Sequence, residues 1–124
     1  MKRDAIVKHE TLIEYGLTKL GSVHDYEAAW EADRLKVAGK MFALLGDIGG
    51  RPIITLKCPP ALAEQLRDAN PEVIPGYYMN KAHWNTLFLD GLLDKAFVHE
   101  MIDISYQEVL KTLPKKVQLT LSAP

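Results

Sequence analysis

The stretch RLKVAGKMFALLGDIGGRPIITLKC, residues 34–58, decides the fold class of this 124-residue chain. Polar and apolar residues alternate from Arg34 to Val37, and glycines interrupt the apolar runs in two places. Alternation is typical of a strand with one buried face, and glycine tolerates the positive φ of a tight turn. The stretch therefore predicts three short strands with tight turns at residues 38–40 and 47–50. Strands joined this closely pair in antiparallel fashion.

A helix is predicted before these strands, because apolar residues recur close to helical spacing between residues 4 and 20. Asp4 is one candidate for its N-cap. Thr11 with Glu14 three residues later is a second candidate, a capping box, which would make the helix shorter. Residues 23–33 (VHDYEAAWEAD) have several acids and no clear period, so we expect a loop there.

More elements follow the three strands. The prolines at 59–60 suit the first turn of a second helix, which Asn70 ends. Residues 73–80 and 83–89 predict two further strands. Asp94 is the expected N-cap of a last helix, whose apolar residues recur three and four positions apart.

These elements predict a mixed α+β fold, with an antiparallel sheet and helices packed on one face, in the order α-β-β-β-α-β-β-α. One domain is expected over residues 1–124, with its core at 4–116. Residues 117–124 are expected to fray or to dock as a stray strand. Helices before and after a sheet of this size cover one face and leave the other toward solvent. We expect the function on that exposed face.

Composition excludes several classes of protein. Fifteen basic and sixteen acidic residues give a net charge of −1, so the overall charge supplies no attraction to nucleic acid. Cys58 is the single cysteine, and the opening MKRDAIVKHE lacks the apolar stretch of a secretory signal. We therefore expect a cytoplasmic protein. No apolar run reaches the ~18 residues of a membrane span, which excludes the membrane-spanning class.

Several stretches resemble the MmcQ/YjbR family of small bacterial proteins, and they occur in the family's order. They are LIEYGLTKLGSV (12–23), LKVAGKMFALLG (35–46), ITLKCPP (54–60), PGYYMNKAHWNTLFLDG (75–91) and MIDISYQEVLKTLPKK (101–116). The resemblance implies a CyaY/frataxin-like α/β sandwich. It also implies a DNA-binding protein in which two hairpins of the sheet form a double wing, and it brings no catalytic residues.

Basic side chains gather in the predicted sheet. Residues 34–57 carry five basic residues against one acid, whereas residues 1–33 carry four against seven. A basic sheet face can neutralise phosphates, and an exposed aromatic ring can stack on a base. The alternative interpretation is that these charges only solvate the sheet. The phosphate-binding candidates are Lys36, Lys40, Arg51, Lys57 and Lys81, with Trp84 as the stacking residue.

The strip NKAHWN, residues 80–85, contributes three more candidates. Asn80, His83 and Asn85 either contact a ligand or hold the strand in place, since a side-chain amide can satisfy backbone groups at a strand end. If Leu87 faces the helices, alternation turns Asn85 the same way and Trp84 toward the open face.

Other functions use different residues. A protein- or small-molecule-binding module on the same face would use Trp30, Tyr77 and Trp84 as aromatic anchors. Metal or iron binding is a third class, for which His99 and Asp103 are the only helical pair at ligand spacing.

The sequence contains no recognisable set of catalytic residues. Cys58 precedes a predicted helix N-terminus, where it is either a reactive thiol or a buried, inert one. GDIGGR, residues 46–51, lacks the ending of a phosphate-binding loop, and there is no nucleophile elbow. We expect a non-enzymatic monomer without a cofactor or metal, with DNA, duplex or single-stranded, as its partner.

Overall fold

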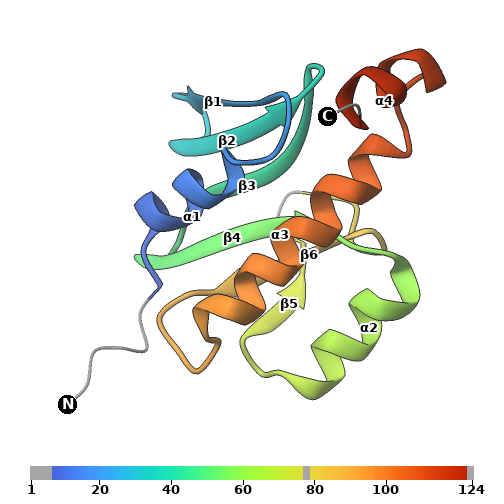
Figure 1. The fold of residues 1–124 in the computed structure, drawn as a ribbon. Coiled ribbons are helices and arrows are strands. Elements are labelled where there is room, and N and C mark those ends of the chain that lie inside the picture. Colours follow the sequence, from blue (N-terminus) through green and yellow to red (C-terminus); the bar gives the residue numbers. More distant parts are fainter. Residues whose placement is uncertain (1–6, 77–78, 123–124) are drawn as a thin grey trace.

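The computed structural model describes residues 7–76 and 79–122 (Figure 1). Within these residues the strands form one sheet in the order β1-β2-β3-β4-β6-β5, and every neighbouring pair is antiparallel. The strands are β1 (Ser22–Glu27), β2 (Ala32–Val37), β3 (Lys40–Ile48), β4 (Arg51–Lys57), β5 (Val73–Pro75) and β6 (Trp84–Phe88). The helices are α1 (His9–Gly16), α2 (Pro60–Ala69), α3 (Lys95–Leu110) and α4 (Lys115–Ser122). None of the described helices is long and apolar enough to cross a bilayer.

The predicted fold class is confirmed, and α1, α2 and α3 lie on one face of the sheet (Figure 1). Alternation along the strands points one set of side chains toward these helices. In the register of the sheet, Leu45 lies opposite Ile54, which lies opposite Leu87. These three side chains pack in one apolar cluster with Leu12 of α1 and Ile102 of α3. Burial of each such side chain contributes ~1.5–3 kcal/mol to folding.

The expected loop at residues 23–33 is wrong, because this stretch contains β1 and the start of β2. β1 lacks an apolar stripe, which is why its sequence resembles a loop. It pairs with β2 over its whole length, from Ser22 opposite Val37 to Glu27 opposite Ala32. The acids on β1 bond cations on β2, so a polar strand is stabilised by its neighbour and not by its own burial.

The expectation for residues 117–124 is also wrong within the described part of the chain. The alternation in QLTL suggested a strand, but residues 115–122 form α4. Val117 and Leu121 lie four positions apart on one side of this helix, and Leu121 packs against the main apolar cluster. The order of elements therefore gains a strand and a helix over the predicted one.

The predicted capping box at Thr11 is wrong, because α1 begins two residues earlier, at His9, and ends at Gly16. Lys8 is the N-cap of α1 and makes no side-chain capping bond, while the Thr11 hydroxyl donates to the Lys8 carbonyl at 2.8 Å. Asp4 lies outside the described residues. The cap of α3 is as predicted, since the Asp94 carboxylate accepts a hydrogen bond from the Phe97 backbone N–H at 2.8 Å.

The two later strands are shorter than expected. β5 covers only three residues of the stretch 73–80, in which residues 77–78 lie outside the described part of the chain, and β6 begins at Trp84. Residues 76 and 79–83 lie between these two strands and belong to neither. We call this segment the β5–β6 loop.

The face of the sheet without helices is not simply open to solvent. Leu44, Ile53 and Thr55 point to this side, yet their exposed fractions are 7%, 2% and 0%. The Thr55 and Thr86 hydroxyl oxygens lie 2.7 Å apart in a hydrogen bond between neighbouring strands. The side chains in the middle of this face are therefore buried. We call the whole face without helices the open face.

One buried hydroxyl joins α3 to the sheet. The Ser105 side chain is fully buried, accepts a hydrogen bond from the Lys57 backbone N–H at 2.8 Å and donates to the Phe42 carbonyl at 2.6 Å. It therefore satisfies a backbone group at the end of β4 and another near the start of β3. The register between β2 and β3 shifts close by, at Leu35 and Lys36. Such an irregularity leaves backbone groups without ladder partners.

Ser105→Ala should lower the free energy of unfolding by ~1–3 kcal/mol, because two buried backbone groups lose their partner. Urea denaturation followed by circular dichroism measures this change. Gln107→Ala on the exposed side of α3 is the control, with an expected change within ~0.5 kcal/mol. A Ser105→Ala protein as stable as the Gln107→Ala protein would contradict the bridging role.

Candidate functional site

Two hollows mark the open side of the sheet. The first, which we call the aromatic hollow, has a volume of about 320 Å³, and its described lining residues are Ala29, Trp30, Leu44 and Met79. The second, the lysine hollow, has a volume of about 310 Å³. Its described lining residues are Lys40, Met41, Lys57, Met79, Trp84, Val109 and Thr112. Met79 of the β5–β6 loop lines both, so the two hollows adjoin.

The aromatic hollow lies between the β1–β2 turn and the β5–β6 loop. Trp30 follows β1 in the turn, where Glu31 takes a positive φ of 51°. The Arg34 guanidinium lies 5.4 Å from the centre of the Trp30 ring. This cation–π contact holds the ring beside the sheet. A smaller depression continues along the open face past Gly46 and Ile53, so the floor of the hollow is largely apolar.

The lysine hollow lies where β3 begins, β4 ends and the last turn of α3 approaches. Lys40 follows a tight turn in which Ala38 and Gly39 have φ of 50° and 80°. Lys57 ends β4 opposite Trp84, the first residue of β6. Within the described residues, neither Lys40 nor Lys57 has a carboxylate within ion-pair distance. The hollow thus combines two ammonium groups with one indole ring.

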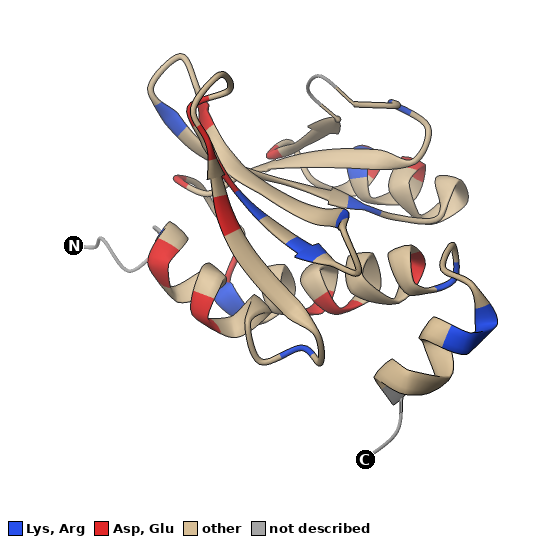
Figure 2. Cartoon of the chain, turned by 90° about the horizontal axis from the view of Figure 1, so that it is seen from above, with Lys and Arg blue, Asp and Glu red and all other residues tan. Residues whose placement is uncertain are grey.

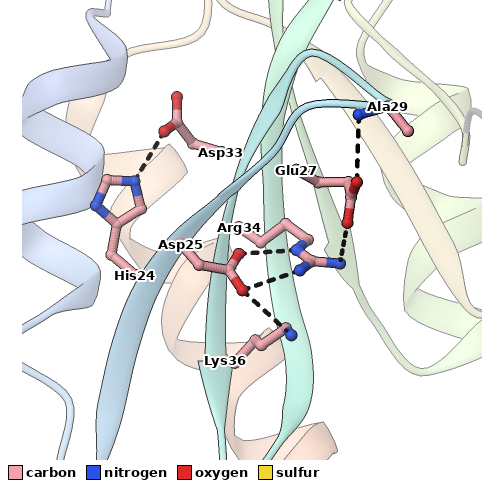
Figure 3. A network of polar contacts seen from close by, with 7 residues as sticks. All are labelled: His24, Asp25, Glu27, Ala29, Asp33, Arg34 and Lys36. Atoms are coloured by element: carbon pink, nitrogen blue, oxygen red, sulfur yellow. Dashed lines mark hydrogen bonds and ion pairs between the residues drawn. The ribbon is translucent and has the colours of Figure 1, made fainter.

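Lys36 lies on the open face but is already paired. Its ammonium lies 3.3 Å from the Asp25 carboxylate, and Arg34 binds the same carboxylate through two hydrogen bonds of 2.8 and 2.9 Å (Figure 3). Glu27 lies 3.5 Å from the other end of Arg34. The Arg34 guanidinium, with Lys36, lowers the pKa of Asp25 to about 2. These acids neutralise the cations of β2.

Arg51 is also paired, at the start of β4. Its guanidinium binds both carboxylate oxygens of Asp90 at 2.8 and 2.9 Å and lies 3.9 Å from the centre of the Phe88 ring. The Arg51 hydrogen bonds hold the pKa of Asp90 below its usual range. Figure 2 shows acidic positions beside basic ones over the sheet. The five predicted phosphate-binding residues therefore do not form one continuous basic face.

The strip NKAHWN organises the β5–β6 loop. The Asn80 side chain accepts a hydrogen bond from the Ala82 backbone N–H at 2.9 Å, which forms a tight local turn. Lys81 folds back so that its ammonium donates to the Gly76 carbonyl at 3.2 Å. The His83 carbonyl accepts a hydrogen bond from the Cys58 N–H at 2.8 Å, which extends the pairing of β4 with β6.

Asn85 joins the sheet to α2. Its side chain is buried, donates to the Ala63 carbonyl at 3.2 Å and accepts from the Arg67 guanidinium at 2.8 Å. Arg67 also donates to the Lys81 carbonyl at 3.4 Å, so it connects α2 to the β5–β6 loop. Asn85 faces the helices, whereas Trp84 lines the lysine hollow on the other side. Tyr77, another predicted aromatic anchor, lies outside the described residues.

Cys58 has the environment of the inert thiol rather than the reactive one. Only 4% of the residue is exposed, and burial raises the pKa of its thiol to about 11, with a further contribution from the charge of Glu108. The thiolate, which is the nucleophilic form, is therefore disfavoured at neutral pH.

His99 and Asp103, the predicted ligand pair, are engaged elsewhere. The His99 ring stacks on Tyr15 with 3.8 Å between ring centres. Asp103 accepts a hydrogen bond from the Tyr15 hydroxyl at 2.6 Å and forms an ion pair with Lys19. Residues 7–76 and 79–122 contain no group of three or more His, Cys, Asp or Glu side chains that can hold a metal ion.

Sequence reasoning missed the carboxylates that neutralise β2 and the methionine between the hollows. A signal for the first exists, since Asp25 and Glu27 have the same two-residue spacing as Arg34 and Lys36. Opposite charges at this spacing are typical of paired antiparallel strands. Met79 carries no comparable signal, because its position depends on how the β5–β6 loop folds over the sheet.

Comparison with known proteins identifies the family. The model of the YjbR family matches residues 17–108. This chain belongs to the YjbR family. The resemblance seen in the sequence motifs is thus confirmed, and the YjbR match includes the whole of β1 to β6 and most of α3.

Relatives in bacteria cover most of the chain. The uncharacterised protein YjbR of Escherichia coli K12 is 36% identical over 105 residues, which are 85% of this chain and 89% of that protein. YbdF of Escherichia coli O157:H7 is 33% identical over 71% of this chain and 72% of its own length.

Solved structures of similar proteins have the same fold. The Deinococcus radiodurans protein DR2400, described with the domain DUF419, has a TM-score of 0.86 at 27% identity, over 100% of this chain and 94% of its own. A Pseudomonas syringae protein has a TM-score of 0.71 at 30% identity, over 82% of this chain and 98% of its own. The YjbR sheet and its helices are thus shared with these structures.

In an NMR pH titration, the Asp25 carboxylate should titrate near pH 2 instead of its ordinary 3.8. A carboxylate with a lowered pKa stabilises the fold above pH 3.8, and this contribution is lost as the pH falls through about 2. Arg34→Gln should move the midpoint toward 3.8, and the Lys36→Gln control should move it less. A wild-type midpoint near 3.8 would contradict the network.

Proposed function

We propose that this YjbR protein is a non-enzymatic binding protein that binds single-stranded DNA in the lysine hollow. The observation that carries the proposal is the convergence of Lys40, Lys57 and Trp84 on one hollow. The two ammonium groups supply the charge that phosphates require, and an indole ring is a stacking surface for an unpaired base. Because the ligand needs only positioning and charge, no catalytic group is required.

The pairing of the other cations favours a single strand over duplex DNA. Proteins that bind duplexes commonly neutralise several phosphates along the backbone. On this sheet Arg34, Lys36 and Arg51 already bind carboxylates, and breaking those pairs would oppose binding. Two lysines beside an aromatic ring suit a short stretch of unpaired nucleotides. The single buried cysteine fits the reducing cytoplasm, where we place the protein.

Fluorescence anisotropy with labelled single-stranded and duplex oligonucleotides tests this proposal. Two phosphate contacts on a single strand predict a slope of about −1.4 for the logarithm of affinity against that of salt. Lys40→Gln with Lys57→Gln should remove most of this slope and weaken binding by about tenfold.

Lys95→Gln is the matched control, because this exposed lysine begins α3 whereas the hollow lies near the end of that helix. Its binding should equal that of the wild type. No binding of single strands at ~50 mM salt, where phosphate contacts are strong, would refute the proposal. If the Lys40/Lys57 and Lys95 substitutions weakened affinity equally, the DNA would not bind specifically in the lysine hollow.

A small molecule is the second candidate ligand, and the aromatic hollow favours it. Its volume of about 320 Å³ falls in the range of small-molecule pockets, which begins near ~300 Å³. Trp30 and Leu44 offer apolar walls for a flat or aliphatic group. In this alternative the neighbouring lysines of the lysine hollow would bind an anionic group of the same ligand.

Tryptophan fluorescence of a Trp84→Phe protein, in which Trp30 is the remaining tryptophan, should detect such a ligand. A library of aromatic carboxylates and mononucleotides should include compounds that change Trp30 emission at micromolar concentrations. Leu44→Lys puts a charge in the apolar wall and should abolish the response, whereas Leu92→Lys at an 85% exposed position should not. A change in emission that survives Leu44→Lys would contradict the assignment to this hollow.

A further inference from the structure

The two edges of the sheet differ in how they are protected. β5 is three residues long and ends at Pro75, which has no backbone N–H to offer. Short edge strands and proline are common protections against pairing with another chain. β1 is six residues long, contains no proline and forms the opposite edge with only β2 beside it. The edge of β1 is therefore the one that can accept another strand.

Every charged or titratable side chain of β1 except Tyr26 is bonded to β2. His24 lies 2.8 Å from the Asp33 carboxylate, and Asp25 and Glu27 both bind Arg34 (Figure 3). Figure 3 shows these side chains pointing toward partners in the same hairpin. Charged side chains on an edge strand normally repel an approaching strand. Here their charges are compensated within the molecule.

The remaining large side chains of β1 are apolar or amphipathic and exposed. Val23 is 56% exposed on the side of the open face, and Tyr26 is 58% exposed on the opposite side. Leu20, just before the strand, is 51% exposed. An edge strand with apolar groups on both sides and no uncompensated charge favours pairing in water.

We propose that a second copy of this chain pairs with β1 in antiparallel fashion, so that two sheets become one continuous sheet across a twofold axis. A charged peptide partner would need uncompensated charges on the edge to recognise, and β1 offers none. A second β1 edge is a suitable partner, because its charges are also compensated and the two edges do not repel each other. In a dimer with a twofold axis both copies use the same surface, so β1 alone supplies both sides of the interface.

The twofold axis restricts the register. Residues directly opposite in an antiparallel pair point to the same side. An axis centred on Asp25 would place two carboxylates opposite each other, which is unfavourable. An axis centred on His24 places Tyr26 of one copy opposite Ser22 of the second, a large residue against a small one. This interface lies apart from the lysine hollow and does not depend on the proposed ligand. It is an alternative to the monomer expected from sequence.

Sedimentation velocity across a range of concentrations tests the proposal. The wild type should shift from the 13.9 kDa of one chain to twice that mass as concentration rises. Val23→Lys with Tyr26→Lys places uncompensated charge on both sides of the edge. It should raise the dissociation constant at least ~10-fold, equivalent to ~1.4 kcal/mol. Leu92→Lys, at an exposed position outside β1, is the control and should leave the dimer unchanged.

Hydrogen exchange by mass spectrometry gives a second measurement that locates the interface. Amides of residues 22–27 should exchange more slowly at high protein concentration in the wild type and in Leu92→Lys, but not in the double variant. A wild type that stays at 13.9 kDa up to millimolar concentration would overturn the proposal. So would a dimer that persists in the double variant, or one whose concentration-dependent protection lies outside β1.

Discussion

The pairing of β3 with β4 constrains both faces of the sheet at once. Leu45 lies opposite Ile54 on the helix side, and Leu44 lies opposite Thr55 on the open face. Because successive side chains alternate, a slip of one residue would exchange the two faces and expose the apolar core. The hydroxyl of Ser105 bonds backbone groups of both strands, at Lys57 of β4 and at Phe42 of β3. The register of β3 with β4 therefore determines both which side chains form the core and which line the open face.

The open face is formed by apolar and aromatic residues more than by accumulated charge. Leu44 and Ile53 at its centre are buried, and Trp30 of the β1–β2 turn and Met79 of the β5–β6 loop lie beside it. Asn85 and its bonds to α2 are on the helix side of β6, so the same strand that anchors the core also presents Trp84 to the lysine hollow. Rigid support behind a partly exposed aromatic residue would reduce the entropy lost on binding a ligand.

The carboxylates of β1 have two effects on the molecule. They neutralise Arg34 and Lys36, whereas Lys40 and Lys57, the cations of the lysine hollow, have no carboxylate within ion-pair distance among the described residues. They also turn the charge of β1 toward β2 and away from the outer edge (Figure 3). Ion pairs between exposed groups contribute little to stability by themselves. These pairs matter here because they leave Lys40, Lys57 and the outer edge of β1 without a carboxylate partner among the described residues.

The sequence by itself determined the antiparallel strands, the cap of α3 at Asp94 and the family, since alternation, caps and linear motifs are local properties. Only the tertiary structure decided that a polar acidic stretch is a strand, because β1 gains its stability from contact with β2. The same holds for the site. Five basic residues looked equivalent in sequence, but a carboxylate nine residues away along the chain, or thirty-nine, neutralises some of them. Which cations stay free depends on strand pairing, and pairing between distant residues is not encoded in local periodicity.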